Sequence, residues 1–462
     1  MIESFRNIFA IPDLRKRIFF TFALLAVYRV GCIIPVPGVN PEVLLQIMEQ
    51  AQRSMFGLLN TFTGGSLANA AIFALGIMPY ITASIILQLL TVVVPYLEKL
   101  SKEGELGRRK ITQYTRYGTL LVSLIQATGI SFAVENIPGP GGQALVSNPG
   151  WGFRLMTILT LTTGCAFVMW LGEQISERGI GNGISLIIFA GIVIGLPNAI
   201  VSTFGKMRTG ELNPVVIFVL VIFMLLVTAF IVYMERAQRR IPVQYAKRVV
   251  GRRVYGGQNT YLPLRVNTGG VIPVIFASSV VMIFPTLSGI FQWEPLQVVS
   301  DTFSWGQPYY YVLYVATIIF FCYFYVSIIF NPQDTAENMR KYGGFIPGIR
   351  SGRRTAEYID RILTRLTLIG AVYLAAVSVL PEIMLFGFKA GNLLPASYGG
   401  DFLERLTPDF LENGLGIDFY FGGTSLLIIV GVAMDFVQQV ESQLVMRNYD
   451  GFLKKGRFRG RR

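Results

Sequence analysis

The sequence contains no histidine, and this absence excludes several kinds of catalytic site. Ser-His-Asp and Cys-His arrangements need an imidazole as general base, and His-ligated metal sites need it as a ligand. The chain also lacks the G-x-x-x-x-G-K-[ST] loop that cradles nucleotide phosphates. We therefore predict that the protein is not an enzyme and has no catalytic residues, no metal and no cofactor.

Cysteine and charged residues are scarce as well. The three cysteines, Cys32, Cys165 and Cys322, fall inside apolar runs, where cysteine usually serves as a small buried residue. Charged residues make up 15% of the chain, against about 25% in an average soluble protein. Hydrophobic residues make up 52%, and this balance predicts a membrane protein.

The hydrophobic residues are gathered in blocks long enough to cross a lipid bilayer. A crossing helix needs about 20 apolar residues to span the ~30 Å hydrocarbon core, and it satisfies its own backbone hydrogen bonds there. We predict an all-α polytopic membrane protein with ten transmembrane helices. The predicted spans cover residues 18–36, 74–95, 117–134, 154–172, 183–204, 214–234, 271–291, 309–330, 366–386 and 419–440.

Positive charge lies mostly on one side of these spans. With the N-terminus in the cytoplasm, the cytoplasmic segments collect 33 of the 40 lysines and arginines, as the positive-inside rule requires. Ten spans then place both termini in the cytoplasm. The net charge of +13 also leaves open a contact with a ribosome or with anionic lipid. Arg29 is an exception, because it falls inside the first span near its outer end, where it could snorkel to the interface.

The ten spans divide into two sets of five. If the sets are structural repeats, the odd number in each set gives them opposite orientations, and such inverted repeats commonly place a functional path at their interface. We expect an N-terminal half at residues 1–210 and a C-terminal half at 211–440. The C-terminal half contains long cytoplasmic loops at 235–270 and 331–365, and a basic cytoplasmic tail follows at 441–462.

Residues 57–73 are unusual because they carry no charge yet are rich in small polar residues. Backbone of this kind is tolerated at membrane depth only where it lines a cavity or is buried in protein. We expect the segment to fold back as a half-helix that occupies the central path; an external surface helix and a disordered loop are the alternatives. The residues that mark it are Asn60, Thr61, Thr63, Gly64, Gly65, Ser66 and Asn69.

Isoleucines at helical spacing follow this segment. Ile81 and Ile85 project from one face of the second span, and Ile184 and Ile188 have the same spacing in the fifth. A collar of branched aliphatic side chains would form a dry constriction that gates by dewetting. The alternative is ordinary helix packing, which is the usual role of aliphatic pairs.

The two long cytoplasmic loops carry turn and helix signals of their own. The runs "RIPVQYA" and "TYLPLRV" flank a Gly-containing turn at "YGGQN" and predict a short β-hairpin. The second loop places Arg350, Arg353 and Arg354 at its tip, and "TAEYIDRILTRLT" predicts a helix that enters the next span. We expect these loops to dock a large partner rather than to be solvated basic connectors.

Several motifs in succession resemble the SecY family, the large subunits of bacterial protein-conducting channels. They are "GIMPYITASIILQLLTVVVPYLEKL", "ISERGIGNGIS", "GRRVYGGQ", "VIPVIFASS", "NPQDTAENMRKYGGFIPGIRSG" and "YFGGTSLLIIVGVAMD". The resemblance implies two inverted five-helix halves around a central pore, which opens sideways between the second, third, seventh and eighth spans. It implies that residues 57–73 form a plug. It also adds Ile275 and Ile428 to the isoleucine ring.

The same resemblance implies a function and a set of partners. The function is a channel of the general secretory pathway in the bacterial plasma (inner) membrane, which passes unfolded preproteins and releases transmembrane segments laterally into lipid. SecA or a translating ribosome would drive transport, and SecE and SecG would be further subunits. Signal peptides, nascent chains, YidC, SecDF and membrane lipid are the other partners it suggests. The docking residues implied are Arg350 in one loop and, in the other, Lys247, Arg248, Arg252 and Arg253.

A solute transporter is the competing class. Ion-coupled transporters commonly use carboxylates buried at mid-membrane. Glu173 and Asp435 fall near the cytoplasmic ends of their predicted spans, and Glu382 falls near an outer end. This placement favours the channel.

Overall fold

The apolar runs form long helices in the computed structural model of the chain. Ten helices correspond to the ten predicted spans: α2 (Pro12–Gly31), α5 (Met78–Val93), α7 (Glu105–Asn136), α8 (Trp151–Arg178), α9 (Gly183–Thr209), α10 (Pro214–Arg236), α11 (Ile272–Val281), α14 (Pro308–Ile329), α16 (Arg353–Phe386) and α19 (Gly423–Lys455). The structure describes residues 11–40, 43–44, 47, 60, 63–136, 145–146, 148–210, 214–245, 248–250, 253–255, 260–281, 283, 288, 294–304, 306–389 and 423–455.

Most of these helices have the length and composition of a membrane span. In the described part of the chain, seven helices meet both criteria, and the bent pair of α5 and α6 (Pro95–Lys102) raises the number to eight. Helix α2 begins in the charged stretch "PDLRKR", and α11 is a shorter apolar helix of 10 residues. The chain is thus an all-α polytopic membrane protein, as predicted from its sequence.

The second predicted span, 74–95, differs from the structure at both ends. Residues 74–77 form turns, and α5 begins only at Met78. At the other end the chain bends by 99° between α5 and α6. Val94 has extended backbone angles there, because the ring of Pro95 disfavours a helical conformation in the preceding residue.

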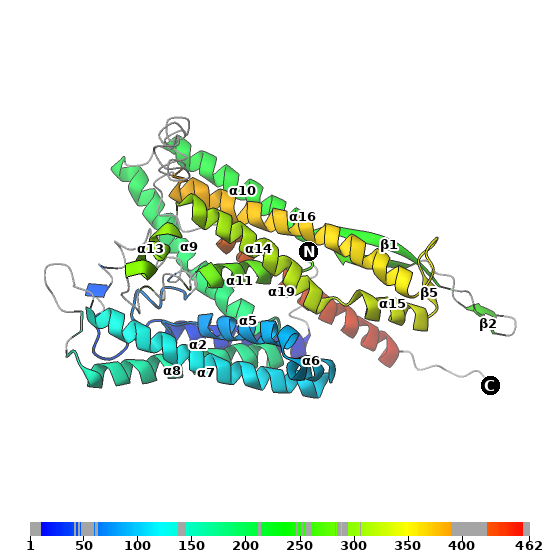
Figure 1. Ribbon diagram of the computed structural model, residues 1–462, viewed down its shortest axis with the longest axis horizontal. Coiled ribbons are helices and arrows are strands. Elements are labelled where there is room, and N and C mark those ends of the chain that lie inside the picture. The colour runs from blue at the N-terminus through cyan, green and yellow to red at the C-terminus, as the bar shows by residue number, and fades with distance from the viewer. Residues whose placement is uncertain are drawn as a thin grey trace.

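The helices form two groups that meet along two contacts. In the first group α5 packs on α7, α7 on α8, and α8 on α2 and α9. In the second, α14 packs on α11 and α16, and α19 packs on α10 and α16. Figure 1 shows α2, α7 and α8 on one side and α10, α14 and α16 on the other, with α9, α11 and α19 between them. The principal contacts between the groups are α5 with α11 and α9 with α19.

The two long basic loops fold together at one end of the bundle. Strand β1 (Gln238–Tyr245) pairs antiparallel with β4 (Thr260–Arg265), which confirms the predicted pairing of the two runs. The predicted turn at "YGGQN" is wrong, because Tyr255 lies in β3 (Arg253–Tyr255), which pairs with β2 (Arg248–Val250) and extends the hairpin. The second loop adds α15 (Pro332–Lys341) and β5 (Gly344–Phe345), which pairs with the other edge of β1. In Figure 1 this β-structure, α15 and α6 lie at one end, and α13 (Glu294–Thr302) lies at the other.

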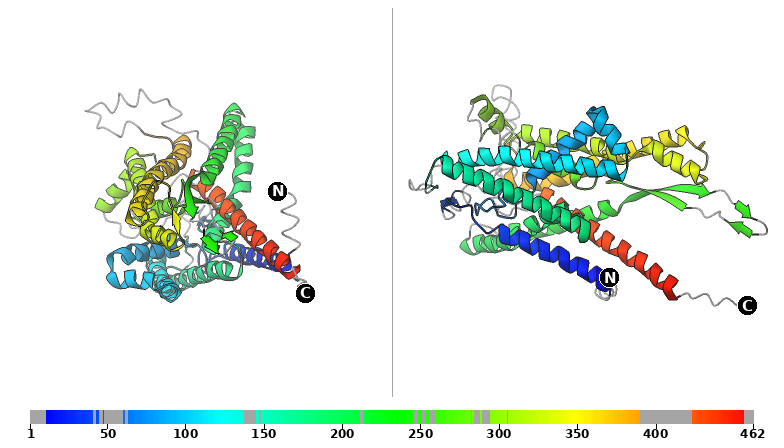
Figure 2. Two further views of the ribbon diagram at one scale, coloured as in Figure 1. Left: turned by 90° about the vertical axis from the view of Figure 1, so that its right-hand side faces the viewer. Right: turned by 90° about the horizontal axis from the view of Figure 1, so that it is seen from below.

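The last helix is longer than predicted. The hydropathy pattern ends the tenth span at residue 440, where the basic tail was expected to begin. Helix α19 instead continues to Lys455, and both views in Figure 2 show it projecting from the bundle. A helical backbone needs no change of direction where its side chains change from apolar to polar, so hydropathy locates the end of a span and not the end of the helix.

Candidate functional site

The six predicted ring isoleucines belong to one apolar core, which also contains Tyr28, Phe73, Ile231 and Tyr314. Ile81, Ile85, Ile188, Ile275 and Ile428 are all buried in it, and Ile184 packs against its edge as a partly buried side chain. They come from α5, α9, α11 and α19. These are the four helices that form the principal contacts between the two helix groups. The core that contains them extends through both helix groups and across the contacts between the groups.

Ile184 differs from the other five. It stands in the first turn of α9, where the side chain of Asn182 caps the helix by accepting a hydrogen bond from the Ile184 N–H at 3.1 Å. Its side chain lies beside Gly172 of α8, where a methyl group added to the glycine would come within 3.3 Å of Ile184 Cγ1. Ile184 thus stands at the rim of the cluster, on the side that faces α8.

The predicted re-entrant segment is buried in the first helix group. In the described part of it, Thr63, Ser66 and Phe73 are almost completely buried. The backbone from Thr63 to Gly76 forms a succession of turns and not the half-helix expected from the sequence. Glycines explain the difference, because Gly64, Gly65 and Gly76 have φ angles of 68°, 81° and 54°, which interrupt a right-handed helix.

Hydrogen bonds hold this irregular backbone together from within. Gly65 N–H donates to the Asn60 carbonyl at 2.8 Å, and Ala71 N–H donates to the Ser66 carbonyl at 2.8 Å. The Ser66 hydroxyl lies 2.8 Å from the Thr63 carbonyl oxygen and 2.9 Å from that of Phe73. Internal bonding of this kind is what buried non-helical backbone requires away from water.

Contacts with α2, α8 and α9 fix the segment in place. The chain after α2 pairs with its end, since Val36 N–H donates to Ala70 O at 2.7 Å and Ile72 N–H to Ile34 O at 2.9 Å. Phe73 stacks between Tyr28 of α2 and Phe167 of α8. The expected alternatives, an external surface helix and a disordered loop, do not describe residues 63–76.

Three glycines of the surrounding helices let the segment approach closely. A Cβ atom at Gly31 would lie 1.9 Å from the Phe73 ring, and one at Gly164 would lie 2.0 Å from the Ile72 carbonyl oxygen. On the opposite side, Gly64 itself packs against the Cα of Gly191 in α9. Side chains at these positions would displace the segment.

The marker residues of the segment have different places in it. Asn60 accepts a hydrogen bond from Ala68 N–H through its side chain at 2.9 Å, and Asn69 reaches back to the Cys32 carbonyl at 3.4 Å. Thr63, Gly64, Gly65 and Ser66 form the turn nearest α2 and α9. Thr61 lies outside the described residues.

The two basic loops share a small apolar core. Ile241, Val243 and Leu264 of the hairpin pack with Met339 of α15 and Ile359 of α16, and Ile346 and Leu366 complete the cluster. This core joins the loops into one unit, which we call the loop platform (residues 238–265 and 332–366). Two loops that are about 70 residues apart in the sequence therefore present a single surface.

Several predicted docking residues stand on the surface of the loop platform. Arg350, Arg353 and Arg354 are exposed, and Arg353 forms an ion pair with Glu357 at 3.0 Å, one turn along α16. Arg248 and Arg253 belong to the paired strands β2 and β3 at the far end of the hairpin. Lys247 and Arg252 lie outside the described residues.

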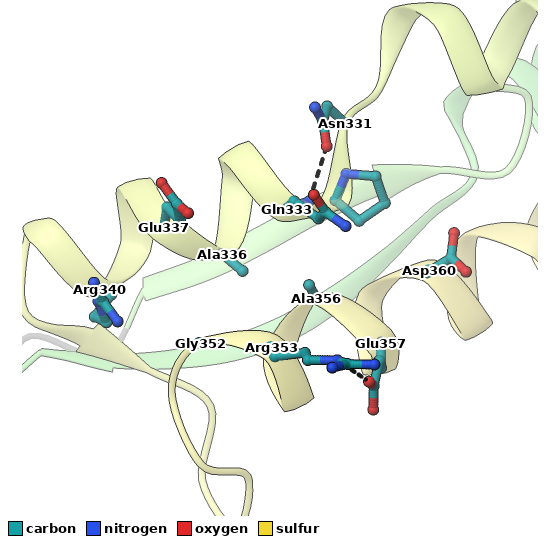
Figure 3. Close-up of a pocket in the computed structure, with 11 residues that line it drawn as sticks. Asn331, Gln333, Ala336, Glu337, Arg340, Gly352, Arg353, Ala356, Glu357 and Asp360 are labelled. Atoms are coloured by element: carbon teal, nitrogen blue, oxygen red, sulfur yellow. Dashed lines mark hydrogen bonds and ion pairs between the residues drawn. The ribbon is translucent and has the colours of Figure 1, made fainter.

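Sequence reasoning missed a groove on the loop platform. Figure 3 shows it between α15 and the start of α16, lined by Gln333, Glu337 and Arg340 on one side and by Arg353 and Asp360 on the other. Its volume is about 690 Å³. The side chain of Asn331 caps α15 by accepting from Gln333 N–H at 3.0 Å, and the sequence "NPQD" is the signal that could have located this helix start.

Two of the three carboxylates relevant to a transporter, Glu173 and Glu382, have structural partners. Glu173 pairs with Arg116 at 2.7 Å between α8 and α7. Glu382 is buried and accepts a hydrogen bond from the Thr424 hydroxyl at 3.1 Å. In the described part of the chain, no group of three or more Cys, Asp or Glu side chains could hold a metal ion. Cys32, Cys165 and Cys322 are free and buried, as predicted.

Comparisons with known proteins agree on one family. The family model named SecY matches residues 71–437. One relative is the protein translocase subunit SecY of Escherichia coli K12, which is 48% identical over 97% of this chain and 96% of its own length. Another is the protein translocase subunit SecY of Aquifex aeolicus, which is 41% identical over 98% of this chain and 100% of its own length.

Solved structures show the same fold. A structure of a protein-conducting channel covers 92% of this chain and 91% of its own, with a TM-score of 0.62 and 17% identity. Sec61 in the canine ribosome–channel complex has a TM-score of 0.58, 17% identity and the same coverage. A family match over most of the chain, together with curated relatives of nearly the same length, establishes that the chain belongs to the SecY family.

Proposed function

We propose that this chain forms a protein-conducting channel whose constriction is the isoleucine cluster between the two helix groups. The observation that carries the proposal is that all six isoleucines lie in one apolar core and come from the four helices that join the groups. Apolar contacts are non-directional, so such a ring can close around polypeptide segments of varied shape and still exclude hydrated ions. Chains would pass in an unfolded state.

The segment at residues 57–73 acts as a second seal at rest. The burial of residues 63–73 between α2, α8 and α9 supports this role, because the contact of Gly64 with Gly191 brings the segment against α9, the helix that carries Ile184 and Ile188. It moves aside when a polypeptide enters. The turns at residues 63–76 favour such movement, since the segment can leave without unwinding a helix.

The contact between α5 and α11 serves as a side exit. It joins the two helix groups and carries Ile81, Ile85 and Ile275, so parting it would open the constriction toward lipid. A signal peptide or a transmembrane segment of a nascent chain would enter there and partition into the bilayer if it is sufficiently apolar. The chain halves at residues 1–210 and 211–440 would then move as two units.

The loop platform docks the partner that supplies the driving force. Arg350 and Arg354 are exposed on it, and the sequence shows no nucleotide-binding loop of its own. A bound SecA ATPase or a translating ribosome supplies the force that moves the polypeptide through the channel. Ribosome docking is supported by the fold relatives, which include Sec61 and Ssh1 channels in complexes with ribosomes. SecE and SecG complete the channel.

The protein lies in a bacterial plasma membrane with both termini in the cytoplasm. The loop platform, α6 and the C-terminal part of α19 gather at one end of the bundle (Figure 1), and these segments contain 19 of the 40 lysines and arginines. The positive-inside rule assigns that end to the cytoplasm. It is also the end at which a cytosolic motor or a ribosome would find the platform.

Reconstitution tests this function. The purified chain is incorporated with SecE into vesicles, and SecA, ATP and an unfolded preprotein are added outside. We expect protease-protected preprotein inside the vesicles, and a resting ion leak after deletion of residues 60–70. Failure to transport, together with saturable uptake of a small solute, would support a transporter instead.

A further inference from the structure

One turn of α2 presents three donor groups to the buried segment. The Tyr28 hydroxyl donates to the Thr63 carbonyl oxygen at 3.2 Å, and the Arg29 guanidinium donates to the Gly64 carbonyl oxygen at 2.9 Å. Cys32 Sγ lies 3.9 Å from the same Thr63 oxygen. Neighbouring side chains of one helix therefore bind two consecutive carbonyl groups of the segment.

The turn geometry directs these carbonyl groups toward α2. Gly64 and Gly65 both have positive φ angles, which turn the chain sharply and keep it out of a regular helix. In a helix the carbonyls of residues 63 and 64 would point along the axis at backbone N–H groups of the next turn. Here the Gly64 carbonyl accepts from Arg29 of α2, and the Thr63 carbonyl accepts from Tyr28 as well as from Ser66 within the segment.

Arg29 is the strongest of the three donors because it carries a charge. Its side chain is half-buried, and it stands in a membrane helix where an unpaired guanidinium is costly. Among the described residues, no carboxylate forms an ion pair with Arg29. The structure thus differs from simple snorkelling, since the guanidinium reaches into the bundle and bonds to the segment.

We propose that Tyr28 and Arg29 form a latch that holds residues 63–65 in the closed position, with Arg29 as its main element. The inference rests on the proposed function, in which this segment seals the channel. Moving the segment breaks a charge-assisted hydrogen bond and leaves the guanidinium without its carbonyl partner. The latch therefore favours return of the segment after each transported chain has passed.

The test measures the open fraction of single resting channels for a set of variants. Arg29→Met removes the charged donor, Tyr28→Phe removes only a hydroxyl, and Arg29→Lys keeps a charge and one donor. Loss of a hydrogen bond from a charged group shifts an equilibrium by about ten- to a hundredfold. We expect an increase of that size for Arg29→Met, a smaller one for Tyr28→Phe, and partial rescue by Arg29→Lys.

Arg154→Met is the matched control. Arg154 is another arginine of the first helix group, and it pairs with Glu135 between α8 and α7. Its loss removes a charge and an ion pair but touches no part of residues 63–65. The resting open fraction of this variant should equal that of the unmodified channel. An equal rise in both arginine variants would overturn the latch.

Deletion of residues 60–70 separates failure of the latch from failure of the seal. In that background Arg29→Met should have no further effect, because the carbonyl that it bonds is gone. If the deletion opens the channel and Arg29→Met does not, the seal stands and the latch is wrong. If the deletion leaves the channel closed, the segment is not a seal, and the proposed latch is then wrong as well.

A covalent substitute for the latch gives a second, independent readout. Thr63→Cys adds a thiol to the residue whose carbonyl oxygen lies 3.9 Å from Cys32 Sγ, and a mild oxidant can join the two sulfurs, which peptide mass spectrometry detects. In the Arg29→Met, Thr63→Cys double variant, oxidation should close the leak and reduction should restore it. A leak that persists in the cross-linked channel would show that Arg29 acts elsewhere.

Discussion

Neighbouring isoleucines of α9 offer a matched test of the constriction. Ile188 and Ile187 are 3% and 1% exposed, and both belong to the same apolar cluster. Successive helix residues point about 100° apart, so Ile187 points away from Ile188 and, like Ile184 at the rim, lies beside Gly172 of α8. The account therefore predicts that Ile188→Ala opens an ion leak through the resting channel, whereas Ile187→Ala does not.

The expected loss of stability is the same for the two variants. Truncation of a buried isoleucine to alanine costs about 2–5 kcal/mol, and the near-equal burial of Ile187 and Ile188 places both changes in that range. What differs is the position of the void. A void beside α8 stays enclosed, whereas a gap in the ring admits water, for which about 30 Å³ per molecule is enough.

The assay compares ion leak from vesicles that contain equal amounts of folded channel. Residues 60–70 are deleted in all samples, so that the second seal does not mask the first. Thermal unfolding measured in parallel checks that both variants lose similar stability. Equal leak from Ile187→Ala and Ile188→Ala would refute the ring, because the effect would then follow from lost packing alone.

Three further predictions concern the loop platform and the buried segment. Arg350→Glu should abolish SecA-driven transport while the control Lys110→Glu, which is also exposed but lies outside the loop platform, retains it, as measured by preprotein import into vesicles; parallel loss in both would indicate only a change of net charge. Gly164→Ala should favour the open state, because its Cβ would lie 2.0 Å from the Ile72 carbonyl oxygen, and single-channel recording would show this; a silent channel would mean that α8 yields to the added methyl group. Ile359→Ala should lower the stability of the loop platform by about 2–5 kcal/mol and increase hydrogen exchange in both β1 and α15, since the Ile359 side chain is fully buried in their shared core. An increase confined to α16 would mean that the two loops fold independently.

Much of the architecture could be predicted from hydropathy and turn chemistry. Apolar runs of span length fixed the order of the ten helices, because no other regular structure of that length satisfies its backbone in lipid. The pairing of β1 with β4 followed from two β-leaning runs, whereas the turn between them was placed wrongly. The isoleucine spacing made Ile81, Ile85, Ile184 and Ile188 candidates for a constriction, and only the family resemblance pointed to Ile275 and Ile428; the ring itself stays a prediction.

The sequence was less informative where tertiary contacts decide the structure. The turns at residues 63–76 depend on close packing against Gly31, Gly164 and Gly191, which are far apart in the chain. The latch at Tyr28 and Arg29 depends on carbonyl groups that become available only once those turns exist. The groove beside α15 likewise arises only when two loops fold on a common core. No pattern in the local sequence predicts contacts between residues so far apart in the chain.

Cross-linking of a transported chain tests the path most directly. In a channel whose three native cysteines are replaced, single cysteines are placed at Ile81, Ile188 or Ile428, and at Ile187 as the control. A preprotein arrested during transport carries a short photo-cross-linker along its length. The account predicts cross-links at all three ring positions and none at Ile187, whereas cross-links at Ile187 with none at the ring would contradict it.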